Sequence, residues 1–206
     1  MAQSSRDRYR EGVNEIPEKL RLGNRDRLPA EIAFLRERYP SSGWTVHSNY
    51  GELSAFWLSV HERLKAQGHA LQQAIREFRE GAEQAAVFRQ RFMPRLGEYL
   101  QHVEGHHQIE DRHYFPRFRR LDRRMVAGFE LLENDHDIIH ERLVASADSA
   151  RALMDALARD RDSARRAADA FAARADRLLI LLDQHLDDEE DLVIPAMLEH
   201  GERPLR

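Results

Sequence analysis

The sequence contains no cysteine among its 206 residues. This absence excludes disulfides, thiolate zinc sites, iron–sulfur clusters and thiol-based catalysis. Long apolar runs are also missing, because the longest, Leu178 to Leu182, falls far short of the ~20 residues that a membrane-spanning helix needs. The segment from Met1 to Arg10 is polar and lacks the apolar core of a secretory signal. We therefore expect a cytoplasmic protein with no membrane partner.

An excess of charge of one sign is missing as well. The chain has 32 basic and 36 acidic residues, which gives a formal net charge of −4. A balance of this kind does not attract nucleic acid, and the arginine-rich stretch at 117–124 is too narrow to form a basic face. We expect no nucleic-acid partner. The unusual component is histidine, with 11 residues.

Apolar residues recur at i, i+3 and i+4 through most of the chain, and strand-like alternation is absent. This period is typical of amphipathic helices. Short connections between long helices favour an antiparallel bundle. The pattern predicts four long helices, at residues 48–78, 82–115, 121–158 and 163–194, the last ending before Pro195 or continuing past it to Glu199.

The organisation that follows is all-α. Residues 46–200 are predicted to form a four-helix bundle, with a tail at 201–206. Residues 1–45 are interrupted by proline and glycine and form a partly helical N-terminal extension, in which a short helix is predicted from Pro29 through Arg38.

One part of the sequence occurs twice. The tetrapeptide His-Glu-Arg-Leu begins at His61 and again at His140, 79 residues later. The same offset relates further pairs: His106 to His185, Glu110 to Glu189 and Phe92 to Phe171. The first two helices and the last two therefore form two copies of one helical hairpin. Packing the copies around a pseudo-two-fold axis would bring equivalent residues close to that axis.

Residues that can bind metal occupy these repeated positions. Residues four apart on a helix lie only ~40° apart around its axis, so each His-x-x-x-Glu or His-x-x-x-His pair faces one way. Five imidazoles and two carboxylates are too many for one ion and suit two ions bridged by carboxylates. Iron, zinc, copper and manganese are all compatible with such ligands. The candidate ligands are His61, His106, Glu110, His136, His140, His185 and Glu189.

Each of these residues alone has an ordinary explanation, as a packed core histidine or as a surface i,i+4 pair. The repetition favours metal, because packing does not require polar residues at the same register in both hairpins, and burying them unpaired would cost several kcal/mol. We expect ordinary packing for His102, and solvent or a neighbouring helix for His107. Trp57 lies 79 residues before His136, so its ring is expected beside the metals.

The pattern resembles the hemerythrin, or HHE cation-binding, family over about residues 50–200. The strongest matches are HHQIEDRHYFP, from His106 to Pro116, and HLDDEEDLVIP, from His185 to Pro195. The resemblance implies a hemerythrin-like bundle that holds two iron ions with an oxo or hydroxo bridge, bound by the seven residues above. Other divalent metals stay compatible. Glu110 and a carboxylate of the last helix would bridge the ions.

Two details of this assignment stay open. The family's oxygen carriers have an Asp five residues after the last histidine, whereas this chain has Glu189 at +4 and Glu190 at +5. We favour Glu189 because it is the repeat equivalent of Glu110. If only one of His136 and His140 binds metal, symmetry with His61 favours His140.

The resemblance implies a protein that binds or senses oxygen, or nitric oxide, rather than an enzyme. Two alternatives are a di-iron enzyme acting on peroxide or oxygen, and a metal-stapled structural or iron-storage bundle. Ferritin-like Glu-x-x-His strings occur at Glu104 and Glu133, but the Glu104 string is not repeated 79 residues later. The oligomeric state is open, and a homo-oligomer is compatible with the sequence.

Overall fold

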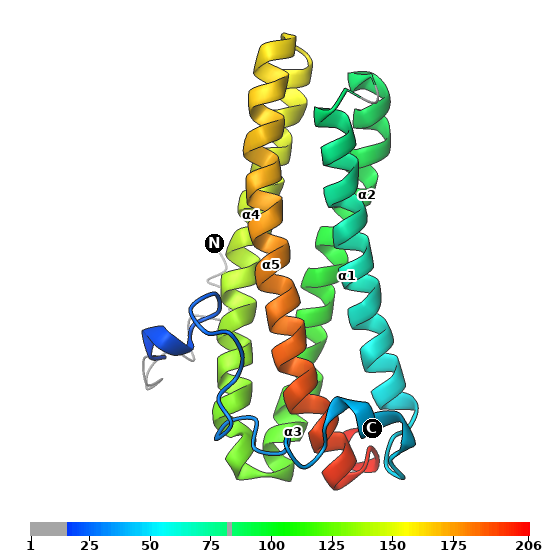
Figure 1. Cartoon of the computed structure of the whole chain (residues 1–206), viewed down its shortest axis with the longest axis vertical. Helices are drawn as coiled ribbons and strands as arrows, with labels where there is room; N and C mark the ends of the chain where they lie inside the picture. The colour runs from blue at the N-terminus through cyan, green and yellow to red at the C-terminus, as the bar shows by residue number, and fades with distance from the viewer. Residues whose placement is uncertain (1–15, 82–83) are drawn as a thin grey trace, which may run out of the picture.

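The computed structural model describes residues 16–81 and 84–206. In this part, four long helices run alternately up and down the molecule (Figure 1): α1 (Glu52–Arg79), α2 (Ala85–Ile109), α4 (Val126–Leu157) and α5 (Arg161–His200). The shorter elements are η2 (Glu18–Leu20), η3 (Ser41–Val46), η4 (Glu110–Tyr114), α3 (Phe115–Leu121), η5 (Arg123–Met125) and η6 (Arg203–Leu205). The predicted all-helical bundle after an N-terminal extension is confirmed.

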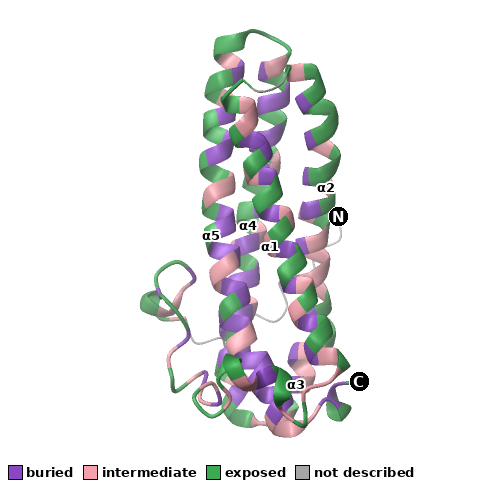
Figure 2. Cartoon of the chain, turned by 45° about the vertical axis from the view of Figure 1, so that its right-hand side comes forward, coloured by how far each residue is buried: buried purple, intermediate pink, exposed green. Residues whose placement is uncertain are grey.

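The four long helices form a ring. Helix α1 packs against α2 and α5, and α4 packs against the same two helices. Buried residues follow the inward side of each helix, and exposed residues the outer side (Figure 2). Two apolar clusters fill the interior, one around Phe88, Phe92 and Phe171 and the other around Phe115 and Phe129. Buried polar residues lie between these clusters along the bundle axis.

The predicted helix at 82–115 is not a single α-helix. Helix α2 ends at Ile109, and the π-helical turn η4 separates it from α3. Pro116 stands in the first turn of α3, where its missing N–H group is not needed. Turns of this wider kind are frequent at functional sites. Here the turn carries Glu110, one of the candidate ligands.

Other helix boundaries also differ from the prediction. The segment from Pro29 through Arg38 forms turns and no helix. Asp160, rather than Ser163, caps α5, and its side chain accepts a hydrogen bond from the backbone N–H of Ser163 at 2.8 Å. Helix α5 continues through Pro195 to His200. No helix of the described residues is long and apolar enough to cross a bilayer.

The N-terminal extension lies along the outside of α4 and α5 (Figure 1). Its Arg25 is buried, at 7% exposure, and pairs with Asp135 of α4 and Asp188 of α5. The guanidinium donates to Asp188 Oδ2 at 2.9 Å and to Asp135 Oδ1 at 3.1 Å. The backbone N–H of Leu28 donates to Asp188 Oδ1 at 2.6 Å. Because buried charges need paired partners, this contact fixes the extension to the second hairpin.

Candidate metal centre

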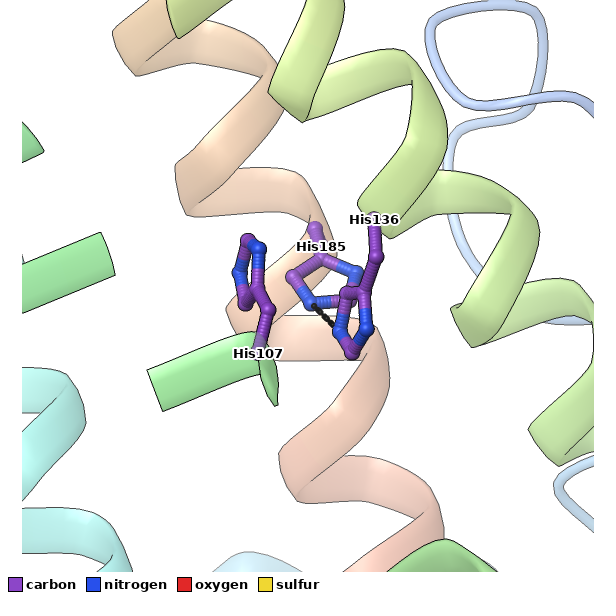
Figure 3. Close-up of side chains that lie close together, drawn as sticks. All are labelled: His107, His136 and His185. Atoms are coloured by element: carbon purple, nitrogen blue, oxygen red, sulfur yellow. Dashed lines mark hydrogen bonds between the residues drawn. The ribbon is translucent and has the colours of Figure 1, made fainter. Parts of the chain in front are cut away.

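Buried histidines and carboxylates from all four long helices meet between the two apolar clusters. They form two neighbouring groups, in each of which one ligand atom per residue lies within 4.8 Å of the others. The first cluster consists of His61, His106, Glu110 and Glu189. The second cluster consists of His107, His136 and His185, whose rings converge in Figure 3.

The two carboxylates connect the clusters. One oxygen of Glu110 lies 3.0 Å from Nε2 of His106, and its other oxygen lies 3.6 Å from Nε2 of His136. Glu189 repeats this arrangement, with one oxygen 3.4 Å from Nε2 of His61 and the other 3.3 Å from Nε2 of His185. Each carboxylate therefore directs one oxygen to each cluster, which is the arrangement of a bridging ligand.

Three carboxylates outside the clusters contact the outer Nδ1 atoms of three cluster histidines. Nδ1 of His61 lies 3.0 Å from Glu190, and Nδ1 of His136 lies 2.7 Å from Asp111. Nδ1 of His185 lies 3.5 Å from Asp135. Metal-binding histidines typically make this outer contact, which orients the ring and fixes its tautomer. The Nε2 atoms are left directed inward.

Several inward-facing atoms have no hydrogen-bond partner within the described chain. They are Nε2 of His61, His106 and His107, both oxygens of Glu110, and Oε2 of Glu189. A buried polar atom left unpaired costs about 1–3 kcal/mol, so six of them together would be a large penalty. A pair of cations between the clusters would satisfy them, and imidazole with carboxylate is a ligand set that transition metals accept. The residues present fit a dinuclear metal site.

The two carboxylates differ in their pKa values. Burial raises the pKa of Glu110 well above its usual value, and the nearby Glu189 raises it further. Burial also acts upward on the pKa of Glu189, but His61 and His185 outweigh it and hold that pKa well below its usual value. The surroundings thus make Glu110 harder to deprotonate than Glu189. Because a carboxylate binds metal in its deprotonated form, a rise in pH favours metal binding at Glu110.

The histidines of the two clusters also differ in their pKa values. Burial lowers the pKa of His106 to about 3, so its imidazole is neutral and ready to bind a cation. Burial also opposes charge on His185, but hydrogen bonds to Asp135 and Glu189 outweigh it and raise its pKa to about 9. The second cluster thus carries a proton that a metal would replace.

The structure brings together six of the seven predicted ligands and leaves out His140. The side chain of His140 is 44% exposed, and its Nδ1 lies 2.8 Å from Glu104 of α2. The offset of ~40° between His136 and His140 around α4 places His140 at the edge of the buried face. The symmetry argument that favoured His140 over His136 therefore fails in the structure.

His107, rather than His140, joins His136 and His185 in the second cluster. It is 4% exposed and stacks on His136, with ring centroids 4.0 Å apart and an interplanar angle of 7°. We expected solvent or a neighbouring helix, and it faces α4 in the interior. A signal for it exists in the sequence, since His107 and Asp111 form a second i,i+4 pair one residue after His106 and Glu110. Asp111 then contacts His136.

Two further expectations concern Trp57 and the last helix. Trp57 is 4% exposed, and its Nε1 donates a hydrogen bond to Glu189 at 2.7 Å, so the ring lies beside the site as expected. Glu189 is fully buried within the first cluster, whereas Glu190 contacts the outer nitrogen of His61. Glu189 therefore lies inside the first cluster, and Glu190 lies outside it, on the far side of the His61 ring.

A pocket of about 300 Å³ opens beside the first cluster, between α1 and α2. Its inner end is formed by His106 and Glu110, and its wall includes Phe56, Trp57 and Ile109. The second cluster does not line it. The two clusters therefore differ in their access from outside.

Four helices that supply five inward imidazoles and two bridging carboxylates define a bundle of the cation-binding class. Residues 53–197 match the family model described as the hemerythrin HHE cation binding domain. The chain belongs to this family, as the resemblance implied. No curated protein and no solved structure matches the chain.

Proposed function

We propose that this chain is a non-haem di-iron protein that binds or senses oxygen, or nitric oxide. The observation that carries the proposal is that Glu110 and Glu189 each direct one oxygen to each histidine cluster. Two cations bridged by two carboxylates would satisfy this geometry. A site rich in nitrogen and oxygen ligands suits iron, although other divalent ions are compatible with the same ligands.

The two metal positions are unequal, which supports binding of a small ligand at one of them. The second cluster offers three imidazoles and the first cluster two, while the two carboxylates serve both. A metal at the first cluster would have fewer protein ligands, and the pocket opens on this side. Bound iron would supply reversible electron transfer to a diatomic ligand.

The chain's own residues control the surroundings of that position. Trp57 holds one oxygen of Glu189 and also forms part of the pocket wall. Phe56, Val60 and Ile109 provide apolar walls that limit water beside His106. Such supporting contacts and apolar surroundings tune both metal affinity and redox behaviour.

The test is anaerobic loading with ferrous iron, followed by elemental analysis and oxygen titration. We expect two irons per chain, and a visible absorption band that appears with oxygen and disappears on degassing. Glu189→Leu is expected to lose both irons, because this residue contributes an oxygen to each cluster. The control is His69→Ala, which removes a histidine side chain that is 59% exposed on α1.

The competing class, an enzyme acting on peroxide, has a distinct signature. Sustained hydrogen peroxide consumption by the iron-loaded protein, without a reversible oxygen band, would replace the proposal with that class. A chain that takes up no iron would contradict both.

A further inference from the structure

The pocket between α1 and α2 is larger than a diatomic ligand requires. Its volume is about 300 Å³, whereas an apolar cavity of roughly 150 Å³ already admits benzene. Phe56 and Ile109 line it, yet their side chains are 57% and 52% exposed, so they stand at its rim. The space therefore has the size of a small organic molecule.

The internal repeat shows what occupies the equivalent place in the second hairpin. Residues 79 positions after the pocket residues Phe56, Gly105 and Ile109 are Asp135, Gln184 and Asp188. Those three side chains bind the N-terminal extension: the two aspartates pair with Arg25, and Gln184 donates to the Arg25 carbonyl at 2.5 Å. One hairpin has this surface covered by its own chain, and the other has a pocket there.

The chemistry of the open pocket differs from that of the covered surface. Apolar Phe56 and Ile109 replace the two aspartates, so a cationic group would lose both of its partners. The pocket wall includes no lysine or arginine that could pair with an anion. Glu110 is the one acidic residue among the described residues of the wall, and its two oxygens are already directed at His106 and His136. The pocket therefore favours an uncharged occupant, because burying an unpaired charge is costly.

A polypeptide segment is also disfavoured in this pocket. In the second hairpin the extension satisfies its backbone groups through Gln184 and Asp188. The equivalent residues, Gly105 and Ile109, have no side-chain donor or acceptor. The two contacts that pair the extension's backbone are therefore missing from the pocket, which favours a small molecule over a chain segment held in the same way.

We propose that this pocket binds a compact, uncharged and mainly apolar organic molecule, with one polar group at the end of the pocket formed by His106 and Glu110. The inference rests on the proposed function only in placing the ligand beside a metal ion. Binding itself depends on the walls of α1 and α2. Trp57 lines the pocket and provides a fluorescence signal for occupancy.

The test uses benzyl alcohol as the neutral probe, with benzoate and benzylamine as charged probes of similar shape. Binding to the full chain is followed by tryptophan fluorescence and by ligand-observed NMR, with and without iron. We expect benzyl alcohol to bind with a dissociation constant on the order of 1 mM. The two charged probes are expected to bind at least about tenfold more weakly.

A matched pair of glycines on α2 isolates the pocket. A Cβ added at Gly105 or at Gly97 meets no atom within 4 Å, so a larger side chain is tolerated at both positions. Only Gly105 lines the pocket. Gly105→Leu is expected to raise the dissociation constant at least about tenfold, while Gly97→Leu changes it by less than about twofold.

The outcomes separate this inference from the di-iron proposal. Equal binding in the two leucine variants, or equal binding of charged and neutral probes, overturns the inference. If the chain binds two irons but no benzyl alcohol, the di-iron proposal stands and the pocket inference is rejected. If the chain binds benzyl alcohol but takes up no iron, the pocket inference stands and the di-iron proposal is rejected. If sedimentation shows a dimer that Gly105→Leu dissociates, the pocket is an interface between copies and the inference fails.

Discussion

The two helical hairpins share one register but are used differently. His61 and His140 begin the same tetrapeptide, yet His61 is fully buried in the first cluster and His140 is 44% exposed on α4. His107 of the first hairpin is buried, and its repeat equivalent in the second hairpin is the buried Leu186. The repeat thus preserves the positions of Glu110 and Glu189 and of His106 and His185, while the other inward histidines differ between the hairpins.

Some supporting contacts have stayed symmetric. Asp111 and Glu190 are repeat equivalents, and each contacts the outer nitrogen of a histidine from the other hairpin. Asp111 holds His136, and Glu190 holds His61. Reciprocal contacts of this kind make each cluster depend on both hairpins. The comparison therefore distinguishes contacts kept by both halves from contacts that only one half makes.

The largest effect is expected at the contact that only the second hairpin makes. Arg25→Met would leave Asp135 and Asp188 buried without their cation. Removing one partner of a buried ion pair typically costs about 3–5 kcal/mol, so the free energy of unfolding should fall by that amount in urea titrations. The control is Arg27→Met, which breaks an ion pair with Asp191 at a 59% exposed side chain and should cost less than about 1 kcal/mol. Equal losses would show that the Arg25 contact is no more important than a surface pair.

The next largest effect is expected at His107, which lies in the second cluster although the repeat predicted His140 there. His107→Ala should weaken iron binding at the second cluster by at least about tenfold, because it removes one of three inward imidazoles. His140→Ala should leave iron binding unchanged, since this side chain contacts Glu104 instead. Elemental analysis after competition with a chelator measures both. The opposite result would restore the ligand set predicted from the repeat.

The sequence predicted what the helical period controls. Residues four apart share a face, so the pairing of His106 with Glu110 and of His185 with Glu189 followed from spacing alone. The bundle and its hairpin repeat followed from the same period. The repeat argument also predicted that Glu189 would lie beside Glu110 in the interior, because equivalent carboxylates occupy equivalent places.

The helical period could not predict how each helix is rotated about its axis or what the N-terminal extension contacts. Whether His107 or His140 faces inward depends on how α2 and α4 are turned about their axes, which packing against neighbouring helices sets. The π-helical turn at Glu110 is likewise a local change that periodicity does not signal. Arg25 lies in a segment without a helical period, and its partners are more than 100 residues away. Tertiary contacts decide such positions.

A smaller effect is expected at the symmetric contacts. Asp111→Asn and Glu190→Gln should each weaken one iron site by about tenfold, as is usual for residues that support a histidine ligand. The two variants should affect different clusters, because Asp111 holds His136 and Glu190 holds His61. Chelator titration should show one iron removed more easily in each variant. Asp187→Asn, at a side chain that is 70% exposed, is the control. Simultaneous loss of both irons would contradict the assignment of one support to each cluster.

The smallest effect is expected at the N-terminus of α1, where the first hairpin begins. Glu202 accepts hydrogen bonds from the backbone N–H groups of Gly51, Leu53 and Ser54 and so caps α1, whereas α4 has no side-chain cap. Glu202→Gln should lower the free energy of unfolding by about 1 kcal/mol near pH 7.

The pH dependence of this contribution has a definite sign. Burial raises the pKa of Glu202, but the N–H groups of α1 outweigh it and leave that pKa below its ordinary value. The stabilisation is therefore complete above the unfolded pKa of about 4.3 and is lost as the pH falls through the lower folded value. Urea titrations at neutral and acidic pH should show the difference between Glu202→Gln and the natural chain shrinking in acid. A difference that does not change with pH would mean that the charge of the Glu202 carboxylate does not contribute to the cap.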